Sequence, residues 1–156
     1  MTSKERVLDR ERQRGRAAAL DLASRAPGMD GTAIIAEEDS IPAWSENAVY
    51  TTEHIGAPVH DGGQVYTLIM PHTPAHNPGA RPADLRAIYD LRHTKDPKRA
   101  KSFVAPYGTS GLWKVDECCT ENGHVWRNLF DGHEYPPSVL PARWEDLGTI
   151  EEVQGA

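Results

Sequence analysis

The sequence lacks any long apolar run, which excludes several classes of protein. Hydrophobic residues make up 38% of the 156 positions, but no stretch reaches the roughly 18 consecutive apolar residues that a membrane-spanning helix needs. The opening stretch, MTSKERVLDRERQRGR, also lacks the apolar core of a secretory signal peptide. We therefore expect a protein that is made in a cytoplasm and is not inserted into a membrane.

Cysteine is equally scarce. The two cysteines, Cys118 and Cys119, are neighbours in the chain, and a disulfide between adjacent residues is strained. This excludes a disulfide scaffold. Small, weakly polar thiols are instead typical of buried strand positions, and we expect both to be buried.

The chain has no excess of basic residues that would favour nucleic acid as a partner. Its 17 Lys and Arg stand against 23 Asp and Glu, for a net charge of -6. Six of the basic residues fall within residues 4–16 beside three acids, which leaves 11 basic and 20 acidic residues elsewhere. Because phosphate contacts require clustered Lys and Arg, we expect no nucleic-acid binding. The alternating signs of 4–16 are typical of a solvated or self-associating helix.

No set of catalytic or metal-binding residues stands out. Asp131 and Glu134 could be imagined as a glycosidase pair, but they fall on a short loop with no expected cleft. His72 and His76 have the spacing of two metal ligands on a helix, yet three prolines between positions 71 and 78 exclude that helix. We therefore expect no catalytic residues, no metal and no cofactor, and a protein that is not an enzyme.

Two helices are predicted before the first strand. Thr2 and Glu5 have the spacing of a capping box, and Pro27-Gly28 ends the helix that they begin. Residues 1–28 are expected to form an attachment or oligomerisation helix, and residues 29–44 to contain a short second helix. The residues proposed for docking or oligomerisation are the apolar side chains of the first helix: Val7, Leu8, Leu20 and Leu22.

An internal repeat appears from about residue 56 onward. Residues 56–83 and 116–142 share glycine, proline and apolar positions at an offset of about 60. The matched pairs are Gly63 with Gly123, Val65 with Val125, Tyr66 with Trp126, Pro78 with Pro137, Pro82 with Pro141 and Ala83 with Ala142. Each copy closes on an aromatic residue followed by an acid and a leucine, at Tyr89 and at Trp144.

Each copy is predicted to begin with a hairpin. Gly62-Gly63 and Asn122-Gly123 are turn dipeptides between alternating apolar and polar residues, and the closing aromatic supplies a third strand. The predicted fold class is mainly β with an N-terminal α region: two tandem small three-stranded antiparallel β modules preceded by helices. The first module spans 45–93, a charged linker spans 94–101, and the second module spans 102–150.

The repeated residues resemble the motif of a known family. The sequence GAPVHDGGQVY, followed by a proline loop and RPA, resembles the pattern of family 5 and 12 carbohydrate-binding modules, which are chitin-binding type 3-like. The sequence ENGHVWRNLFDGHEYPPSVLPARWEDLG resembles it more closely, and MDGTAIIAEEDSIPAW resembles the helix that precedes such modules in small phage tail or fibre proteins. The resemblance covers roughly residues 29–148.

The sequence departs from this family at the sugar-binding positions. Where the family has a pair of exposed aromatics, the first copy has Met70-Pro71 and the second Phe130-Asp131. Trp113 follows a Gly-Ser loop and is the aromatic most expected to be exposed, although packing in a core or an oligomer stays open; Trp144 is expected to pack. The candidate sugar-binding residues are Trp113, Tyr107, Phe130, Tyr135 and Trp144.

The resemblance implies a bacteriophage virion protein, associated with a tail, a fibre or a capsid, that is assembled in the host cytoplasm. Its expected partners are copies of itself and other virion proteins. The alternative is a lectin-like adhesin that binds a host cell-wall polysaccharide through the second module.

Overall fold

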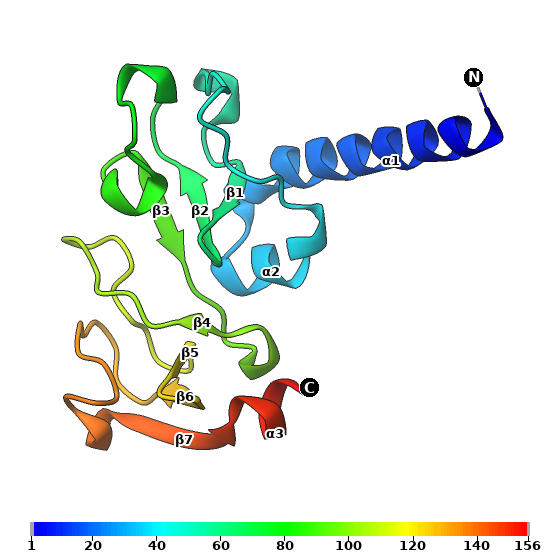
Figure 1. The fold of residues 1–156 in the computed structure, drawn as a ribbon. Helices are drawn as coiled ribbons and strands as arrows, with labels where there is room; N and C mark the ends of the chain where they lie inside the picture. Colours follow the sequence, from blue (N-terminus) through cyan, green and yellow to red (C-terminus); the bar gives the residue numbers. More distant parts are fainter. Residues whose placement is uncertain (1, 156) are drawn as a thin grey trace.

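The computed structural model describes residues 2–155 and contains a projecting helix and two small sheets (Figure 1). The first sheet follows the helices in the chain, and the second precedes a short terminal helix. The elements are α1 (Ser3–Arg25), α2 (Gly31–Ala36), β1 (Pro58–Asp61), β2 (Gln64–Leu68), β3 (Tyr89–Arg92), β4 (Lys101–Ser102), β5 (Cys118–Glu121), β6 (His124–Asn128), β7 (Trp144–Thr149) and α3 (Ile150–Gln154).

The predicted boundaries of α1 are confirmed. The Thr2 hydroxyl accepts a hydrogen bond from the Glu5 amide at 3.1 Å, and the Glu5 carboxylate accepts one from the Thr2 amide. This capping box satisfies two amides that a helix start leaves unpaired. A single 3₁₀ turn over Ala26–Gly28 then ends the helix where the proline and glycine predict.

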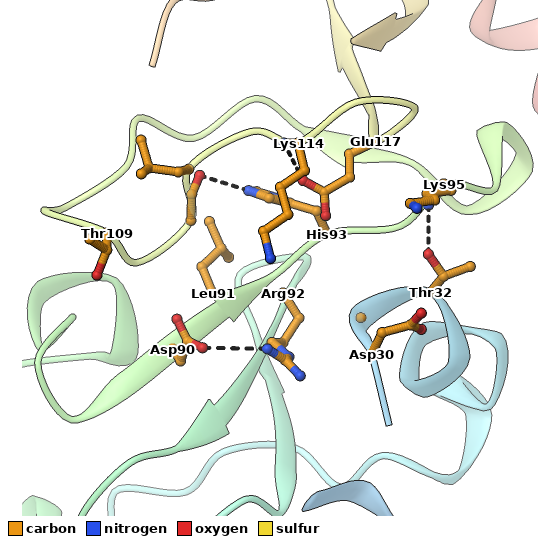
Figure 2. Close-up of a pocket in the computed structure, with 13 residues that line it drawn as sticks. Asp30, Thr32, Asp90, Leu91, Arg92, His93, Lys95, Thr109, Lys114 and Glu117 are labelled. Atoms are coloured by element: carbon orange, nitrogen blue, oxygen red, sulfur yellow. Dashed lines mark hydrogen bonds and ion pairs between the residues drawn. The ribbon is translucent and has the colours of Figure 1, made fainter. Parts of the chain in front are cut away.

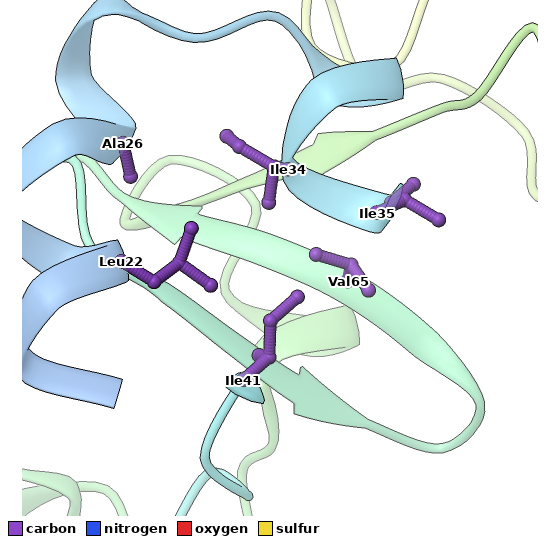
Figure 3. Packing of buried hydrophobic residues seen from close by; sticks show 6 residues of the cluster. All are labelled: Leu22, Ala26, Ile34, Ile35, Ile41 and Val65. Carbon is purple, nitrogen blue, oxygen red and sulfur yellow. The ribbon is translucent and has the colours of Figure 1, made fainter. Parts of the chain in front are cut away.

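The end of α1 and all of α2 cover one face of the first sheet. Figure 3 shows the six buried side chains of this cluster, which are Leu22, Ala26, Ile34, Ile35, Ile41 and Val65. Leu22 is fully buried among them, so its proposed role in docking or oligomerisation is wrong. Burial of a leucine contributes about 2 kcal/mol, and here it anchors α1 to its own chain.

Both hairpins form as predicted. Gly62 and Gly63 join β1 to β2 with φ angles of 57° and 79°, and Asn122 and Gly123 join β5 to β6 with 52° and 78°. Positive φ at both central residues is typical of the type I′ turn, whose twist matches that of the strands. Cys118 and Cys119 are free and buried on β5, as expected.

The prediction of two three-stranded antiparallel modules is right for the first sheet and wrong for the second. The second sheet has four strands in the order β4-β5-β6-β7, and β4 runs parallel to β5. At the matching place in the first module, Ala43 makes a single parallel bridge to His60. Both modules therefore have a parallel pairing at this place, which is a single bridge in the first module and the strand β4 in the second. With three α-helices beside the sheets, the chain is mixed α and β, so the mainly β class is only partly right.

The structural repeat is more extensive than the repeat in sequence. In the first module, Tyr50 and His72 exchange two backbone hydrogen bonds of 2.9 Å. In the second, the Trp113 amide donates to the His133 carbonyl at 3.1 Å. Each pair connects the loop before the hairpin to the loop after it, so the two modules share a framework outside the strands.

The same residues form matching clusters of rings. His72 packs edge-on against Tyr89 with ring centres 5.5 Å apart, and His133 packs on Trp144 at 5.4 Å. Trp44 meets Tyr89 at 6.5 Å, as Phe103 meets Trp144 at 6.3 Å. Such T-shaped pairs each add about 1 kcal/mol beyond area burial. The two ring clusters are Trp44, Tyr50, His72 and Tyr89 in the first module and Phe103, Trp113, His133 and Trp144 in the second.

The two modules are joined by specific contacts. Residues 94–101, expected as a charged linker, are tied at several points: Thr94 bridges Cys118, and the Glu38 carboxylate accepts hydrogen bonds from Arg99 and Lys101. The Gln64 amide also donates to the Ser102 carbonyl at 3.0 Å. The charges of this segment therefore hold the 3₁₀ turn after α2, Glu38–Ser40, against the second sheet.

Replacing Gly31 with Ala should destabilise the fold by about 2 kcal/mol, because overpacking forces a backbone shift. A Cβ at Gly31 would lie 2.1 Å from the His93 carbonyl oxygen. Urea unfolding followed by tryptophan fluorescence measures the change. Gly15→Ala is the matched control: nothing lies within 4 Å of its Cβ, so only the helicity of α1 should rise. Equal urea midpoints for Gly31→Ala and the wild type would contradict this packing.

Candidate functional site

Trp113 is buried in the core, so its role as a candidate sugar-binding residue is wrong, and the packing alternative is right. Its side chain is 1% exposed and stacks between His93 at 3.6 Å and Phe103 at 5.4 Å between ring centres. Neither ring face is free to stack on a sugar. The Gly-Ser loop was a misleading signal, because Gly111 has a φ of +75° and packs against Leu91 and Arg86. The loop therefore turns inward and carries Trp113 with it.

Trp144 is also committed to packing, as the sequence favours. It is 4% exposed, lies edge-on to Trp113, and its indole N–H donates to the Tyr135 carbonyl at 2.9 Å. The prediction that Trp144 binds sugar is therefore wrong. Its indole N–H supports the loop at Tyr135, and its ring is not accessible to a ligand.

Phe130 and Tyr135 are the exposed aromatics of the second module that share one loop. They are 50% and 43% exposed. The loop is held by Asn128, which is fully buried at the end of β6. Its side-chain amide donates to the Phe130 carbonyl at 2.7 Å and to the Lys114 carbonyl at 2.8 Å. Asn128 is not among the predicted site residues, although an asparagine at the position of Leu68 in the first copy distinguishes the second copy.

His133 completes the support of this loop. The Tyr135 amide donates to His133 Nδ1 at 3.2 Å, and His133 Nε2 contacts the side-chain oxygen of Asn128. Since Nδ1 accepts, this network assigns the imidazole hydrogen to Nε2 and a neutral ring. Burial lowers the pKa of His133, with Arg143 adding in the same direction. Phe130 and Tyr135 are thus presented by a preformed loop.

Arg143 covers one side of the Phe130 ring. Its guanidinium carbon lies 5.2 Å from the ring centre, within the range of a cation–π contact. The surface around Phe130 therefore combines a half-exposed aromatic ring with a positive charge. Leu129, which precedes Phe130 in the chain, is also exposed and adds apolar area.

Tyr107 is separate from this loop. It is 64% exposed and lines a different hollow, of about 260 Å³, with Leu85 and Ile88 of the first module. Of the five predicted sugar-binding residues, the structure places two on one exposed loop, one elsewhere on the surface and two in the core.

The first module presents the equivalent positions without aromatics. Ile69 and Met70 follow β2 as Leu129 and Phe130 follow β6, and they are 43% and 46% exposed. His72 fixes this loop through Tyr89 Oη at 2.7 Å and Asn77 Oδ1 at 2.8 Å. Both modules therefore display an apolar pair at the same place in the fold.

The second exposed surface is on α1. Val7, Leu8 and Leu20 are 52%, 42% and 72% exposed. At 3.6 residues per turn, Leu8 lies about four turns before Leu22 and on the same side of the helix, whereas Leu20 lies about a third of a turn from Leu8. Val7 and Leu8 thus extend the stripe that packs at Leu22, and Leu20 does not belong to it.

Neither a cluster of metal ligands nor a membrane-spanning helix is found within residues 2–155. No three His, Cys, Asp or Glu side chains are grouped there as metal ligands would be. Nor does any described helix combine the length and apolar composition needed to cross a membrane. A scan against models of protein families and a search of curated proteins each found no match.

The buried imidazoles predict how stability changes with pH. Burial is the main cause that lowers the pKa of His93, to about 4. The unfolded chain therefore binds more protons than the folded chain between that value and about 6.5, and stability falls as the pH is lowered through this range. From pH 7 to pH 5 the loss from His93 should be about 2 kcal/mol.

Urea unfolding at the two pH values tests this, with His93→Phe to keep a stacked ring on Trp113. The variant should lose most of the pH dependence over this range. His76→Gln, at an exposed position, should retain it. A His93→Phe protein with the same pH dependence as the wild type would assign the effect to other groups.

Proposed function

We propose that the chain is a non-catalytic structural protein of a bacteriophage particle, associated with its tail, a fibre or its capsid. In this proposal α1 associates with other copies and docks on neighbouring virion proteins, and the two modules are displayed outward. The assignment to a phage particle rests on the resemblance of residues 29–148 to modules of small phage proteins.

The observation that carries the proposal is the unpartnered part of α1. The helix extends away from both sheets (Figure 1), and Leu22 is its only buried residue. A helical segment that makes so little contact with its own fold is marginally stable in water, since helices gain most of their stability from packing. Contact along Val7 and Leu8 with a second helix would supply that packing.

Charge also favours association between copies. Residues 4–16 carry six basic and three acidic side chains, while the rest of the chain has 20 acidic and 11 basic residues. Alternating charges around a helix can pair across a helix–helix contact. The positive segment of one copy is also complementary to the acidic body of another, which steers the two together.

Substitution of the stripe on α1 tests the proposal. The wild-type chain should sediment as an oligomer at micromolar concentrations, and Val7→Glu with Leu8→Glu should sediment as a monomer whose tryptophan fluorescence, which reports on the two modules, is unchanged. Val49→Glu is the matched control, because Val49 is 60% exposed on the first module and should leave the oligomer intact. Substitution is preferred to removing residues 1–28, which would also remove core residues Leu22 and Ala26.

A monomeric wild-type chain, or an oligomer that survives the double substitution, would contradict association through α1. Sedimentation equilibrium at several concentrations distinguishes these outcomes. Salt offers a second readout: if the charge pairs contribute, raising the ionic strength should weaken the oligomer, because exposed charges are screened.

The second candidate function is a lectin-like adhesin, favoured by the presented loop of Phe130 and Tyr135. Rings held in place before binding lose little conformational entropy when a ligand covers them. In this candidate the second module holds a cell-wall polysaccharide, while the first, with Ile69 and Met70 in place of an aromatic pair, contributes little.

Retention on insoluble chitin, cellulose and peptidoglycan tests the second candidate. It predicts retention that Phe130→Ala and Tyr135→Ala each weaken about tenfold, since stacked rings contribute on the order of 1–2 kcal/mol. Met70→Ala, at the equivalent position of the first module, is the control and should bind as the wild type does. A wild-type chain that passes through all three matrices would rule out the adhesin on these polysaccharides.

A further inference from the structure

A polar cleft lies where α2, the end of β3 and residues 109–117 meet (Figure 2). Its volume is about 450 Å³. It contains parts of both modules and is separate from α1 and from the Phe130 loop. Its lining includes three acidic and three basic side chains, so the question is which of these charges already have partners inside the protein.

The walls of the cleft are held in place by close backbone contacts. Gly31 packs directly on the His93 backbone, and Gly111 packs on Leu91. The Thr32 hydroxyl accepts a hydrogen bond from the Lys95 amide at 2.9 Å, and His93 Nε2 bonds to the Gly111 carbonyl at 2.9 Å. The cleft is therefore preformed, and a ligand would not have to order it.

Each acidic side chain in the lining already has a partner. The Asp30 carboxylate caps α2 by accepting from the Ala33 amide at 2.8 Å. Asp90 accepts from the Ser110 hydroxyl at 2.8 Å, and its other oxygen lies 3.5 Å from Arg92. Glu117 accepts from the Lys114 amide at 2.7 Å. These carboxylates are used to build the cleft.

Two of the three basic side chains have no such partner. Across residues 2–155, the ammonium groups of Lys95 and Lys114 make no hydrogen bond or ion pair with protein. Figure 2 shows the Lys114 side chain extending from its loop into the cleft. Arg92 differs from the lysines, because its terminal nitrogens pair with Asp90 and donate to the Met29 carbonyl at 3.1 Å. Its buried Nε has no acceptor, and a buried donor without an acceptor costs about 1–3 kcal/mol.

All three cations act on one of these carboxylates, Glu117. Lys114, Lys95 and Arg92 each act to lower the pKa of Glu117, although burial outweighs them and raises it. The cleft therefore holds three cations and three carboxylates, and the two ammonium groups are the charges left without a partner among residues 2–155. An anion that enters the cleft would give the two ammonium groups a charged hydrogen-bond partner.

We propose that this cleft binds the carboxylate or phosphate group of a small polar ligand, with Lys114 contacting the anion and Arg92 adding positive charge beside it. Lys95 adds charge from the side of α2, and the Thr109 hydroxyl, which also lines the cleft, can hydrogen-bond the rest of the ligand. A ligand held here contacts both modules and so fixes their relative position. The site depends on neither the adhesin nor the association through α1.

Titration calorimetry at low salt tests the site with inorganic phosphate, glucuronate and neutral glucose. The wild-type chain should bind phosphate, glucuronate or both with a dissociation constant on the order of 1 mM, and should not bind glucose. Phosphate alone indicates a phosphate ligand, and glucuronate alone an acidic sugar. Absence of saturable binding for both anions overturns the proposal.

Variants locate the binding. Lys114→Gln should weaken binding about tenfold, and Lys95→Gln severalfold, since each removes one charge from the anion. Lys98→Gln is the matched control: Lys98 is exposed in the turn after β3 and does not line the cleft, so it should bind as the wild type does. Equal affinity of Lys114→Gln and wild type, or an equal loss in Lys98→Gln, overturns the assignment.

Amide chemical shifts give a readout that does not depend on affinity. Adding the anion that binds should move the amide signals of Thr109, Gly111 and Lys114 in the wild type, because these residues line the cleft. The same shifts in Lys114→Gln at equal anion concentration, or shifts confined to α1, would place the anion elsewhere and overturn the proposal.

Discussion

The stacking of His93 on Trp113 joins the two modules, and much of the remaining structure depends on it. His93 directly follows β3 of the first sheet, and Trp113 is the centre of the ring cluster of the second. For the rings to meet, residues 109–113 must fold back onto β3, which requires the close contact at Gly111. That fold buries Trp113, forms one wall of the polar cleft, and keeps His93 neutral by removing it from water.

The need for such a contact follows from the size of the sheets. A sheet of three or four short strands cannot bury a core by itself, so each face must be covered by something else. In both modules a ring cluster covers one face. The other face is covered by Leu22 and α2 in the first module, and by Val153 of α3 in the second. The projecting helix α1 is thus anchored by a structural requirement of the first sheet, and only its remaining length is free for a partner.

Local signals in the sequence predicted much of the fold. The capping box at Thr2, the two type I′ turns and the closing strands at Tyr89 and Trp144 all depend on neighbouring residues, and all are confirmed. The missed features depend on contacts between distant residues. The Gly-Ser loop suggests that Trp113 is exposed, but His93 and Phe103, which are distant in sequence, enclose its ring. The apolar stripe of α1 includes Leu22, but Ile34 and Val65 bury this residue. In the sequence Asn128 is an ordinary polar strand residue, and its role becomes clear only from its hydrogen bonds to Phe130 and His133.

The repeat explains why the two modules can differ in function while sharing a framework. The histidine and the closing aromatic are kept in both loops, at His72 and Tyr89 and at His133 and Trp144, because they hold the loop after the hairpin. The residues that this loop presents are not needed for packing, so they are free to differ. The first module presents Met70 and the second Phe130, at equivalent positions and with similar exposure. Selection for binding can therefore act on the presented pair alone, while the rings beneath preserve the fold.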